Sequence, residues 1–243
     1  MRQEEQTKRR IISKLMREAA TIFSRGQGHD MSPALPKMRA AVRLATELED
    51  KTPLVICESN YASMAAVLGD QQEASEHIEH AIRVSMTGEM PTTIRNFVIT
   101  KFVEIAILLH EDRERALTYA RALLQSAVEE EQNYQQYLAA AFNLAVVCHE
   151  LFRNDQWAVA LFSFIDNDDV PHDHPIPKQA RLLSAKIAIE QEGEDPDVWL
   201  SEVEANRDFL LEEATGGFLP KYAPGPPDDS VWDEPGPEFT DEF

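Results

Sequence analysis

The residues with the clearest chemical potential are histidines and acids that share a helix face. Glu73, His77 and His80 stand at positions i, i+4 and i+7, so one face of a helix would present all three side chains to a metal ion. The same segment has the pattern of a second helix in a helical hairpin, whose polar face points to solvent. We therefore expect a solvated helix face here rather than a metal site.

Two other groups fall short of known metal and catalytic patterns. The segment "CHELFRN" supplies His149 and Glu150 but lacks the second histidine, four residues after the first, that a zinc protease needs. Residues 166–175, "DNDDVPHDHP", gather four aspartates and two histidines, but the glycine and the terminal glutamate of a calcium loop are missing. The sequence also lacks a phosphate-binding glycine motif and a nucleophile elbow. These absences predict a protein that is not an enzyme and that uses no cofactor or metal.

The two cysteines, Cys57 and Cys148, lie far apart in the chain, each in an apolar helical context. Neither has a second cysteine nearby, as a zinc site or a local disulfide would require. Both are expected to be buried, reduced thiols.

The charge of the chain excludes a further class of function. The formal net charge of −20 argues against nucleic-acid binding, which depends on lysine and arginine neutralising phosphates. Most of this charge comes from residues 190–243, where 17 acidic residues face only Arg207 and Lys221. The N-terminus is basic, but no apolar run follows that would form a signal-peptide core or a membrane span. We expect a cytoplasmic protein with no membrane contact.

The elements that must position any binding residues are helices. The composition is rich in Ala, Leu, Glu, Gln and Arg and contains only nine glycines, which predicts an all-α protein. Small residues recur in this helical pattern at an interval of about 42. In "LGDQQEASEHIEHAI", for example, Gly69 marks a turn, and Ala74 and Ala81 let the following helix pack closely on the preceding one.

Three segments repeat this layout and can be aligned column by column. Successive residues in each column are 41 or 42 positions apart. The columns are Ala65, Ala106 and Cys148; Ala74, Ala116 and Ala158; Ile78, Ala120 and Phe162; and Ala81, Leu123 and Ile165. The turn glycine is kept only at Gly69, and His110 and Phe152 take its place in the other two segments.

A weaker unit precedes the three segments and another follows them, as expected for the ends of a stack. The first has Phe23, then Ala34, Met38 and Ala41; the last has Ile187 and Ile189, then Trp199, Val203 and Leu210. Prolines at 53, 91 and 171–177 fall between hairpins, and Asp30, Thr52 and Asp195 are suitable helix caps. The sequence thus predicts five hairpins and about ten helices over residues 1–213, followed by a tail at 214–243.

The repeats "NYASMAAVLGDQQEASEHIEHAI" and "NLAVVCHELFRNDQWAVALF" resemble tetratricopeptide repeats. The resemblance covers residues of roughly 10 to 213, and the period of about 42 is similar to the long-helix variety of that family. It implies a right-handed α-solenoid of antiparallel helical hairpins. The competing interpretation is an irregular helical bundle in which the alanine spacing is accidental.

The resemblance also implies a peptide-binding groove lined by the first helix of each hairpin. In peptide-binding members, a polar residue two positions before the small residue of the first helix faces the ligand. Asn60 and Asn143 hold this position here, and Lys101 holds it in the third hairpin. An amide offers one donor and one acceptor group to an extended backbone, whereas Lys101 and Arg17 would hold a carboxylate.

Neighbours on the same helix faces complete the predicted groove: Ser63, Glu104 and His149. Their mixture with apolar residues predicts an amphipathic ligand. The alternative is that Asn60 and Asn143 are ordinary hydrogen-bonding residues between helices.

The tail contains six prolines and seven acidic residues after residue 217, so a stable helix or a core of its own is not expected. Its apolar anchors suggest docking rather than mere solubilisation: Phe218, Leu219, Tyr222, Trp232, Phe239 and Phe243. The proximal anchors would cap the last hairpin. The distal "SVWDEPGPEFTDEF" would bind another protein, fold back into the groove near Lys101, or imitate nucleic acid; a plain disordered extension is the remaining alternative.

These observations predict a non-enzymatic adaptor or regulator that binds a protein or peptide in its groove, with the acidic tail as a second contact or an internal competitor. The alternative function is that of an assembly subunit, which stacks on partners or on its own copies through its convex face and its ends and has no peptide groove.

Overall fold

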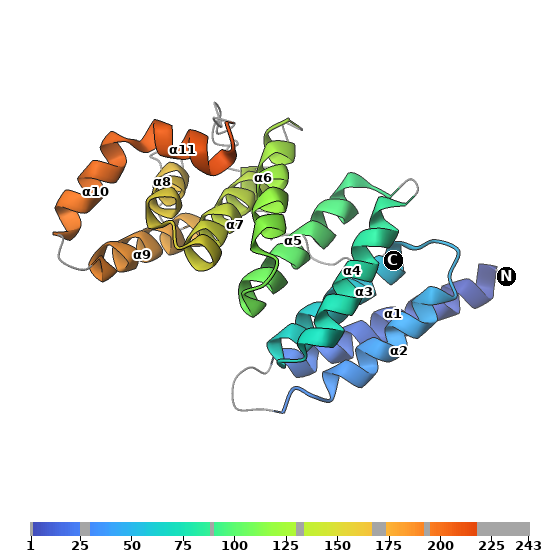
Figure 1. Cartoon of the computed structure of the whole chain (residues 1–243). Coiled ribbons are helices and arrows are strands. Elements are labelled where there is room, and N and C mark those ends of the chain that lie inside the picture. Colours follow the sequence, from blue (N-terminus) through green and yellow to red (C-terminus); the bar gives the residue numbers. More distant parts are fainter. Residues whose placement is uncertain are drawn as a thin grey trace. The chain divides into compact units, whose positions relative to one another are not determined.

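The computed structural model describes residues 2–24, 30–87, 90–129, 134–166, 174–191 and 195–217. These residues form helices and connecting turns, with no strand among them, so the all-α prediction is confirmed (Figure 1). The helices are α1 (Arg2–Phe23), α2 (Ala34–Thr46), α3 (Thr52–Val67), α4 (Gln71–Met86), α5 (Thr92–Leu109), α6 (Arg113–Glu129), α7 (Tyr134–Phe152), α8 (Asp155–Ile165), α9 (Pro175–Glu190), α10 (Pro196–Ala205) and α11 (Arg207–Thr215).

The chain divides between Leu109 and His110 into two compact units. In the first unit α1 packs against α2 and α3 packs against α2, α4 and α5. In the second unit α7 packs against α6 and α8, while α8 also contacts α9, α10 and α11. The division falls inside the third predicted hairpin, because α5 belongs to the first unit and α6 to the second.

The repeated small residues lie in the cores of the two units. Ala74, Ala116 and Ala158 are fully buried, as expected for positions where a larger side chain would push two helices apart. The larger members of the other columns, such as Ile78 and Phe162, are also buried. The repeated spacing of the small residues therefore marks positions where two helices pack closely.

The turns between helices use a left-handed backbone at the predicted points, with one correction. Gly69 has φ +80°, a conformation that glycine adopts without the steric penalty of a side chain. His110 has φ +53° and so takes the same role. In the fourth hairpin the left-handed residue is Arg153, with φ +54°, and not Phe152, which still belongs to α7.

Of the three predicted helix caps, only Asp195 is confirmed, since its side chain accepts hydrogen bonds from the backbone N–H groups of residues 197 and 198. Asp30 instead accepts from Ser32 N–H in the turn before α2, whose N-cap residue is Pro33. Thr52 is the first residue of α3 and its N–H group donates to Asp50. The capping prediction was wrong at these two positions because the helices begin later or earlier than the pattern suggests.

The described residues form eleven helices rather than about ten, because the last predicted helix is interrupted at Asn206. Trp199 and Val203 are buried on α10, whereas Leu210 is buried on α11, which packs against α8. Ile189, grouped with Ile187 by the pattern, is 72% exposed.

Candidate functional site

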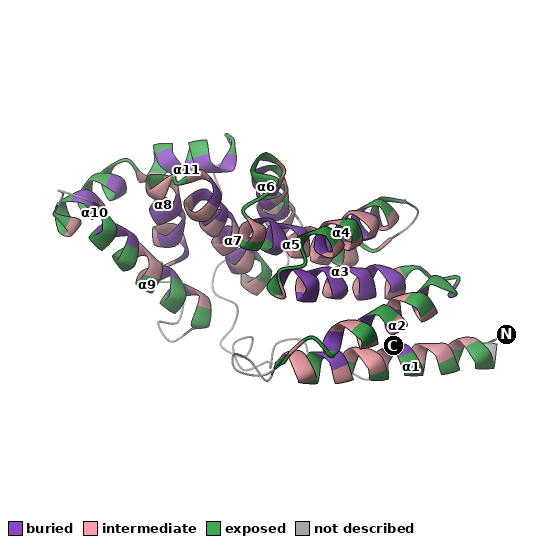
Figure 2. Cartoon of the chain, turned by 60° about the horizontal axis from the view of Figure 1, so that its bottom comes forward, coloured by how far each residue is buried: buried purple, intermediate pink, exposed green. Residues whose placement is uncertain are grey.

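The helices α3, α5 and α7 are the first helices of the three central predicted hairpins, and α3 is buried on most of its surface (Figure 2). Ten residues of α3 are buried, including the polar Glu58 and Ser59. The partly exposed positions after its first turn are Ile56, Asn60, Ser63 and Val67, spaced by four, three and four residues. This spacing places them on one face of the helix, which we call the open stripe of α3.

The helix α5 has an equivalent open stripe, made of Phe97, Lys101, Glu104 and Leu108 with the same spacing. Because α3 packs against α5, the two stripes lie on neighbouring helices of one unit. The C-terminal residues of the two stripes, Val67 and Leu108, are 47% and 49% exposed. The stripes therefore combine polar groups in the middle with exposed apolar side chains at one end.

In the second unit, the partly exposed positions of α7 again follow helical spacing and include Phe142, Asn143, Val146 and His149. Every predicted groove residue on α3, α5 and α7 thus lies on the open face of its helix. Arg17 lies on α1 and is exposed. Whether these residues bind a ligand remains a prediction.

The two predicted amides differ from their neighbours in their hydrogen bonding. Neither Asn60 nor Asn143 makes a side-chain hydrogen bond within the part of the chain that the structure describes. By contrast, Ser63 donates to the carbonyl of Ser59, 3.2 Å away. Both amides therefore keep a donor and an acceptor group available on a half-buried helix face.

The predicted charged and histidine groups of the groove have partners within the chain. Lys101 Nζ lies 2.8 Å from Glu104 Oε2, and its ammonium group lies 5.9 Å from the centre of the Phe97 ring. His149 Nδ1 lies 2.7 Å from Asp155 Oδ1, which joins α7 to α8. A ligand carboxylate would have to compete with Glu104 for Lys101.

A polar cluster that the sequence pattern placed in solvent instead joins α3 to α4. The carboxylate of Glu58, only 4% exposed, accepts hydrogen bonds from His77 and from His80, whose Nδ1 atom lies 2.8 Å away. Burial raises the pKa of Glu58, but the two histidine hydrogen bonds outweigh it, so the pKa lies below its ordinary value. The spacing of the two histidines was visible in the sequence, but their buried acceptor lies 19 residues before His77 and 22 before His80, on another helix.

Tyr61 extends this cluster toward α2. Its hydroxyl group donates to Glu73 and accepts from Arg39, 2.8 Å away, while its ring lies 4.1 Å from that of His77. Burial, followed by the hydrogen bond to Glu73, raises the pKa of Tyr61 to about 12. These hydrogen bonds connect α2, α3 and α4, and the donors and acceptors of the cluster pair with one another.

Cys57 and Cys148 are buried free thiols, as predicted, and burial raises the pKa of each to about 12, so neither is a thiolate at neutral pH. Over the described ranges, no three His, Cys, Asp or Glu side chains form a group that could hold a metal ion. Of the acidic loop at 166–175, residues 167–173 lie outside the described residues, and His174 caps α9.

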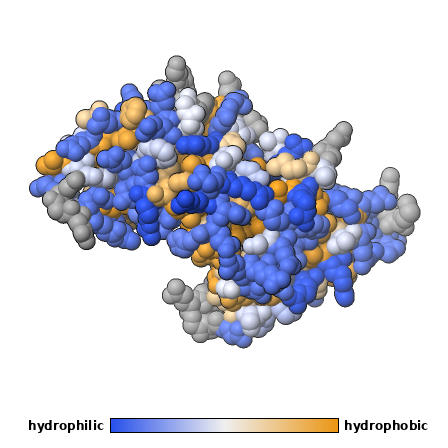
Figure 3. Space-filling view, viewed as in Figure 1, coloured by the Kyte–Doolittle hydropathy of each residue, from blue (hydrophilic) through white to orange (hydrophobic). Residues whose placement is uncertain are grey.

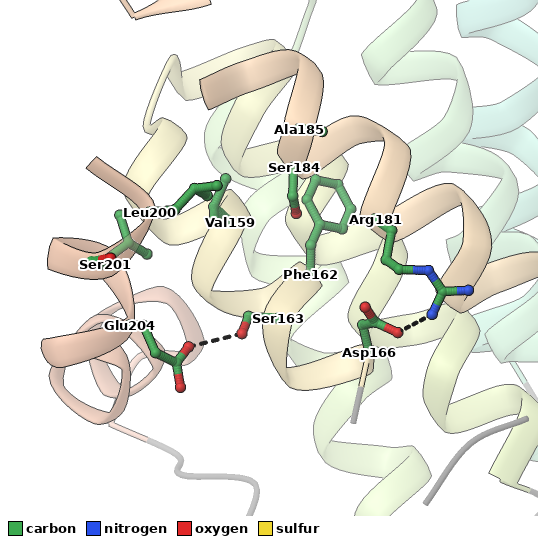
Figure 4. Close-up of a pocket in the computed structure, with 11 residues that line it drawn as sticks. Val159, Phe162, Ser163, Asp166, Arg181, Ser184, Ala185, Leu200, Ser201 and Glu204 are labelled. Carbon is green, nitrogen blue, oxygen red and sulfur yellow. Dashed lines mark hydrogen bonds and ion pairs between the residues drawn. The ribbon is translucent and has the colours of Figure 1, made fainter. Parts of the chain in front are cut away.

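A hollow of about 520 Å³ opens between α8, α9 and α10 in the second unit. Its polar groups form two pairs at opposite sides, Ser163 with Glu204 at 2.9 Å and Arg181 with Asp166, and the Phe162 ring lies between them (Figure 4). The remaining lining is mainly apolar or small: Val159, Ser184, Ala185, Leu200, Ser201 and Val203. The hollow is suited to an apolar side chain because its charged groups already have partners.

The predicted docking residues of the tail, Phe218, Tyr222, Trp232, Phe239 and Phe243, lie outside the described residues. Among the described helices, none is both long and apolar enough to cross a membrane. Comparison with known proteins found no match to a family model, a curated protein or a solved structure.

Proposed function

We propose that the chain is a non-enzymatic adaptor that binds an extended segment of a partner protein along the open stripes of its first helices. The observation that carries this proposal is the state of Asn60 and Asn143. Each lies on the open face of an otherwise buried helix without a side-chain hydrogen bond in the described residues. A half-buried amide without an internal partner is poorly explained as a link between helices, which was the competing interpretation.

The packing order of the helices supports a repeat arrangement for this function. Within the first unit α3 contacts α1 and α5, and within the second unit α7 contacts α9, so first helices lie next to first helices. The second helices α2, α4 and α8 each contact the first helix that follows them. Within each unit this order is expected of stacked hairpins in a right-handed solenoid, and stacked hairpins present neighbouring first helices to a ligand.

The ligand that fits these stripes is an extended, amphipathic peptide. The amides offer a donor and an acceptor group to a peptide backbone, and the exposed Val67 and Leu108 offer apolar contacts. Lys101 and Glu104 pair with each other, so they add polar contacts rather than a net charge. We place the adaptor in the cytoplasm, with the acidic tail as an internal competitor for the peptide.

Peptides selected from a random display library on the immobilised full chain would test this proposal. The double variant Asn60→Ala and Asn143→Ala should weaken their binding at least tenfold, because each amide loses two backbone hydrogen bonds. Gln72→Ala, which removes an exposed amide from the second helix α4, is the matched control and should bind normally. Selected peptides that bind the double variant as tightly as the wild type would refute the groove.

A specific observation also favours the second function, that of an assembly subunit. Val198 on α10 and Phe209 on α11 are 58% and 60% exposed, and hydrophobic residues break the hydrophilic surface there (Figure 3). Exposed apolar residues at the end of a helical stack are suited to contacts with another subunit. A concentration-dependent sedimentation coefficient that Phe209→Asp abolishes would support assembly, including that of a homo-oligomer.

A further inference from the structure

One face of α9 carries apolar residues that stay exposed among the described helices. Leu182 and Ile189 are 64% and 72% exposed, and Ala185, between them in sequence, is also exposed. Figure 2 shows several exposed stretches along α9. Their spacing of i, i+3 and i+7 places them on one face of the helix. We call these three residues the α9 stripe. Such a continuous row, unlike isolated exposed apolar residues, indicates a contact surface.

The α9 stripe adjoins the hollow between α8, α9 and α10, because Ala185 belongs to both. The floor of the hollow includes Val159, Phe162 and Leu200. A chain segment on the α9 stripe would therefore have room for one large side chain beside it. An indole group suits this hollow, since Ser184 and Glu204 in its lining offer acceptor oxygens to the N–H group and the apolar lining residues offer contacts to the rings.

The charge of α9 selects an acidic occupant. Lys178, Arg181 and Lys186 outnumber Glu190, the one acid on this helix, whereas the chain as a whole is strongly acidic. Arg181 pairs with Asp166 and Lys186 Nζ lies 3.8 Å from Glu190 Oε1, which leaves Lys178 without an acidic partner among the described residues. Lys178 and Lys186 are both exposed and flank the α9 stripe. A segment with aromatic and acidic residues would thus bury its apolar groups against the stripe and place its carboxylates near the lysines.

We propose that the distal tail of the same chain, Ser230–Phe243, is that occupant. It contains Trp232, Phe239 and Phe243 together with five acidic residues and no basic residue. Trp232 enters the hollow, and the two phenylalanines cover the α9 stripe.

The length of the tail permits this contact within one chain. Trp232 lies 15 residues beyond Gly217, where the described residues end. As a general estimate, a random-coil chain of about 15 residues spans roughly 20 Å on average and about 50 Å when fully extended. The helix α11 packs against α8, which packs against α9, so two helix-to-helix spacings of about 10 Å separate the ends. Such a tether supplies the tail at an effective concentration of about a millimolar.

The inference rests on the proposed function and deepens it. The helix α9 is the first helix of the last predicted hairpin and contacts α7, the helix that carries Asn143. A tail bound to α9 would occupy part of the layer on which a partner peptide is proposed to lie. The tail would then act as an internal competitor at a defined place.

Limited chymotrypsin digestion of the full-length protein tests the docking without any partner. Cleavage after Trp232 and Phe239 should be slow in the wild type and about tenfold faster in Leu182→Asp and in Ile189→Asp, because a buried carboxylate would prevent docking. Met86→Asp is the matched control, since Met86 is a large apolar residue that is 50% exposed but lies on α4, in the other unit. It should leave the tail protected.

Hydrogen exchange of α9 supplies the reciprocal measurement. Trp232→Ala should increase exchange of α9 amides severalfold and leave exchange of α3 unchanged. Equal cleavage rates in the wild type and both α9 variants, with equal α9 exchange in Trp232→Ala, would overturn the inference. Protection that disappears on dilution would also overturn it, because the occupant would then be the tail of another copy. The Asn60 and Asn143 variants leave this assay unaffected, so failure of docking and failure of peptide binding are separate results.

Discussion

Replacing Glu58 by glutamine tests whether the buried polar cluster holds α3 and α4 together. The wild-type carboxylate offers one oxygen to His77 and the other to His80. Glutamine has nearly the same shape but offers only one acceptor oxygen, together with an N–H₂ group. One histidine therefore loses its acceptor, and the other keeps an acceptor that no longer carries a charge. A hydrogen bond to a charged group contributes about 1.5–3 kcal/mol, so we expect the first unit to lose about 2–4 kcal/mol of unfolding free energy at pH 7.

The sign of the pH dependence follows from the lowered pKa of Glu58. A carboxyl group with a folded pKa below its ordinary value of 4.5 contributes all of its stabilisation above about pH 4.5 and loses it as the pH falls through the folded value. The stability difference that the Glu58 charge causes between wild type and Glu58→Gln should therefore be complete above about pH 4.5 and shrink at lower pH. Other acidic residues titrate in both proteins and cancel in the difference.

Urea unfolding followed by circular dichroism, with hydrogen exchange of α3 and α4 to locate the effect, would measure this difference at several pH values. Glu76→Gln is the matched control, because Glu76 is exposed on α4 and its loss should change stability by less than about 0.5 kcal/mol. A Glu58→Gln protein as stable as the wild type, or a stability difference that is the same at pH 7 and pH 4, would refute the assigned role of the cluster.

Three further substitutions probe the turns and helix contacts. Arg121→Ala should increase amide exchange in α11 by at least tenfold. Arg121 donates to the carbonyl groups of Glu213 and Ala214 at 2.8 Å, near the C-terminal end of that helix. Unchanged exchange would contradict this role. Gly69→Ala should cost about 1–2 kcal/mol in urea unfolding, since the strain comes from φ +80° while the space around it is open; a neutral result would mean that the turn relaxes. Ala81→Leu should cost about 1–3 kcal/mol by overpacking a fully buried position, and an unchanged midpoint would show that α3 and α4 can separate.

The positions of the groove residues were predicted from helical periodicity alone, and the sequence could locate them because this periodicity is a local property. Asn60 and Ser63 lie between buried positions at spacings that only one face of a helix can satisfy, so their partial exposure follows from the sequence. Whether an amide has a partner does not follow, because a partner would come from another helix. The pairing of Lys101 with Glu104 could have been anticipated, since residues three apart on a helix are neighbours.

Predictions failed where a contact joined distant parts of the chain or where a turn shifted by one residue. The polar face of α4 was placed in solvent because that helix is amphipathic, yet His77 and His80 on this face donate hydrogen bonds to the buried Glu58 of α3. The left-handed residue at Arg153 rather than Phe152 reflects an extra residue in α7, a boundary that no local pattern specified.

By itself, the sequence determined that the chain is helical, where the small residues let helices pack, and which face of each first helix stays open. It did so because helix propensity and the 3.6-residue period are local properties, readable from neighbouring residues. Three features were decided only by the tertiary structure. A buried carboxylate joins α3 to α4, and the last predicted helix is interrupted at Asn206, so that α11 packs against α8. The helix α9 keeps an exposed apolar stripe. These features depend on which helix lies beside which, and that arrangement follows from the sum of many weak contacts between residues far apart in the chain.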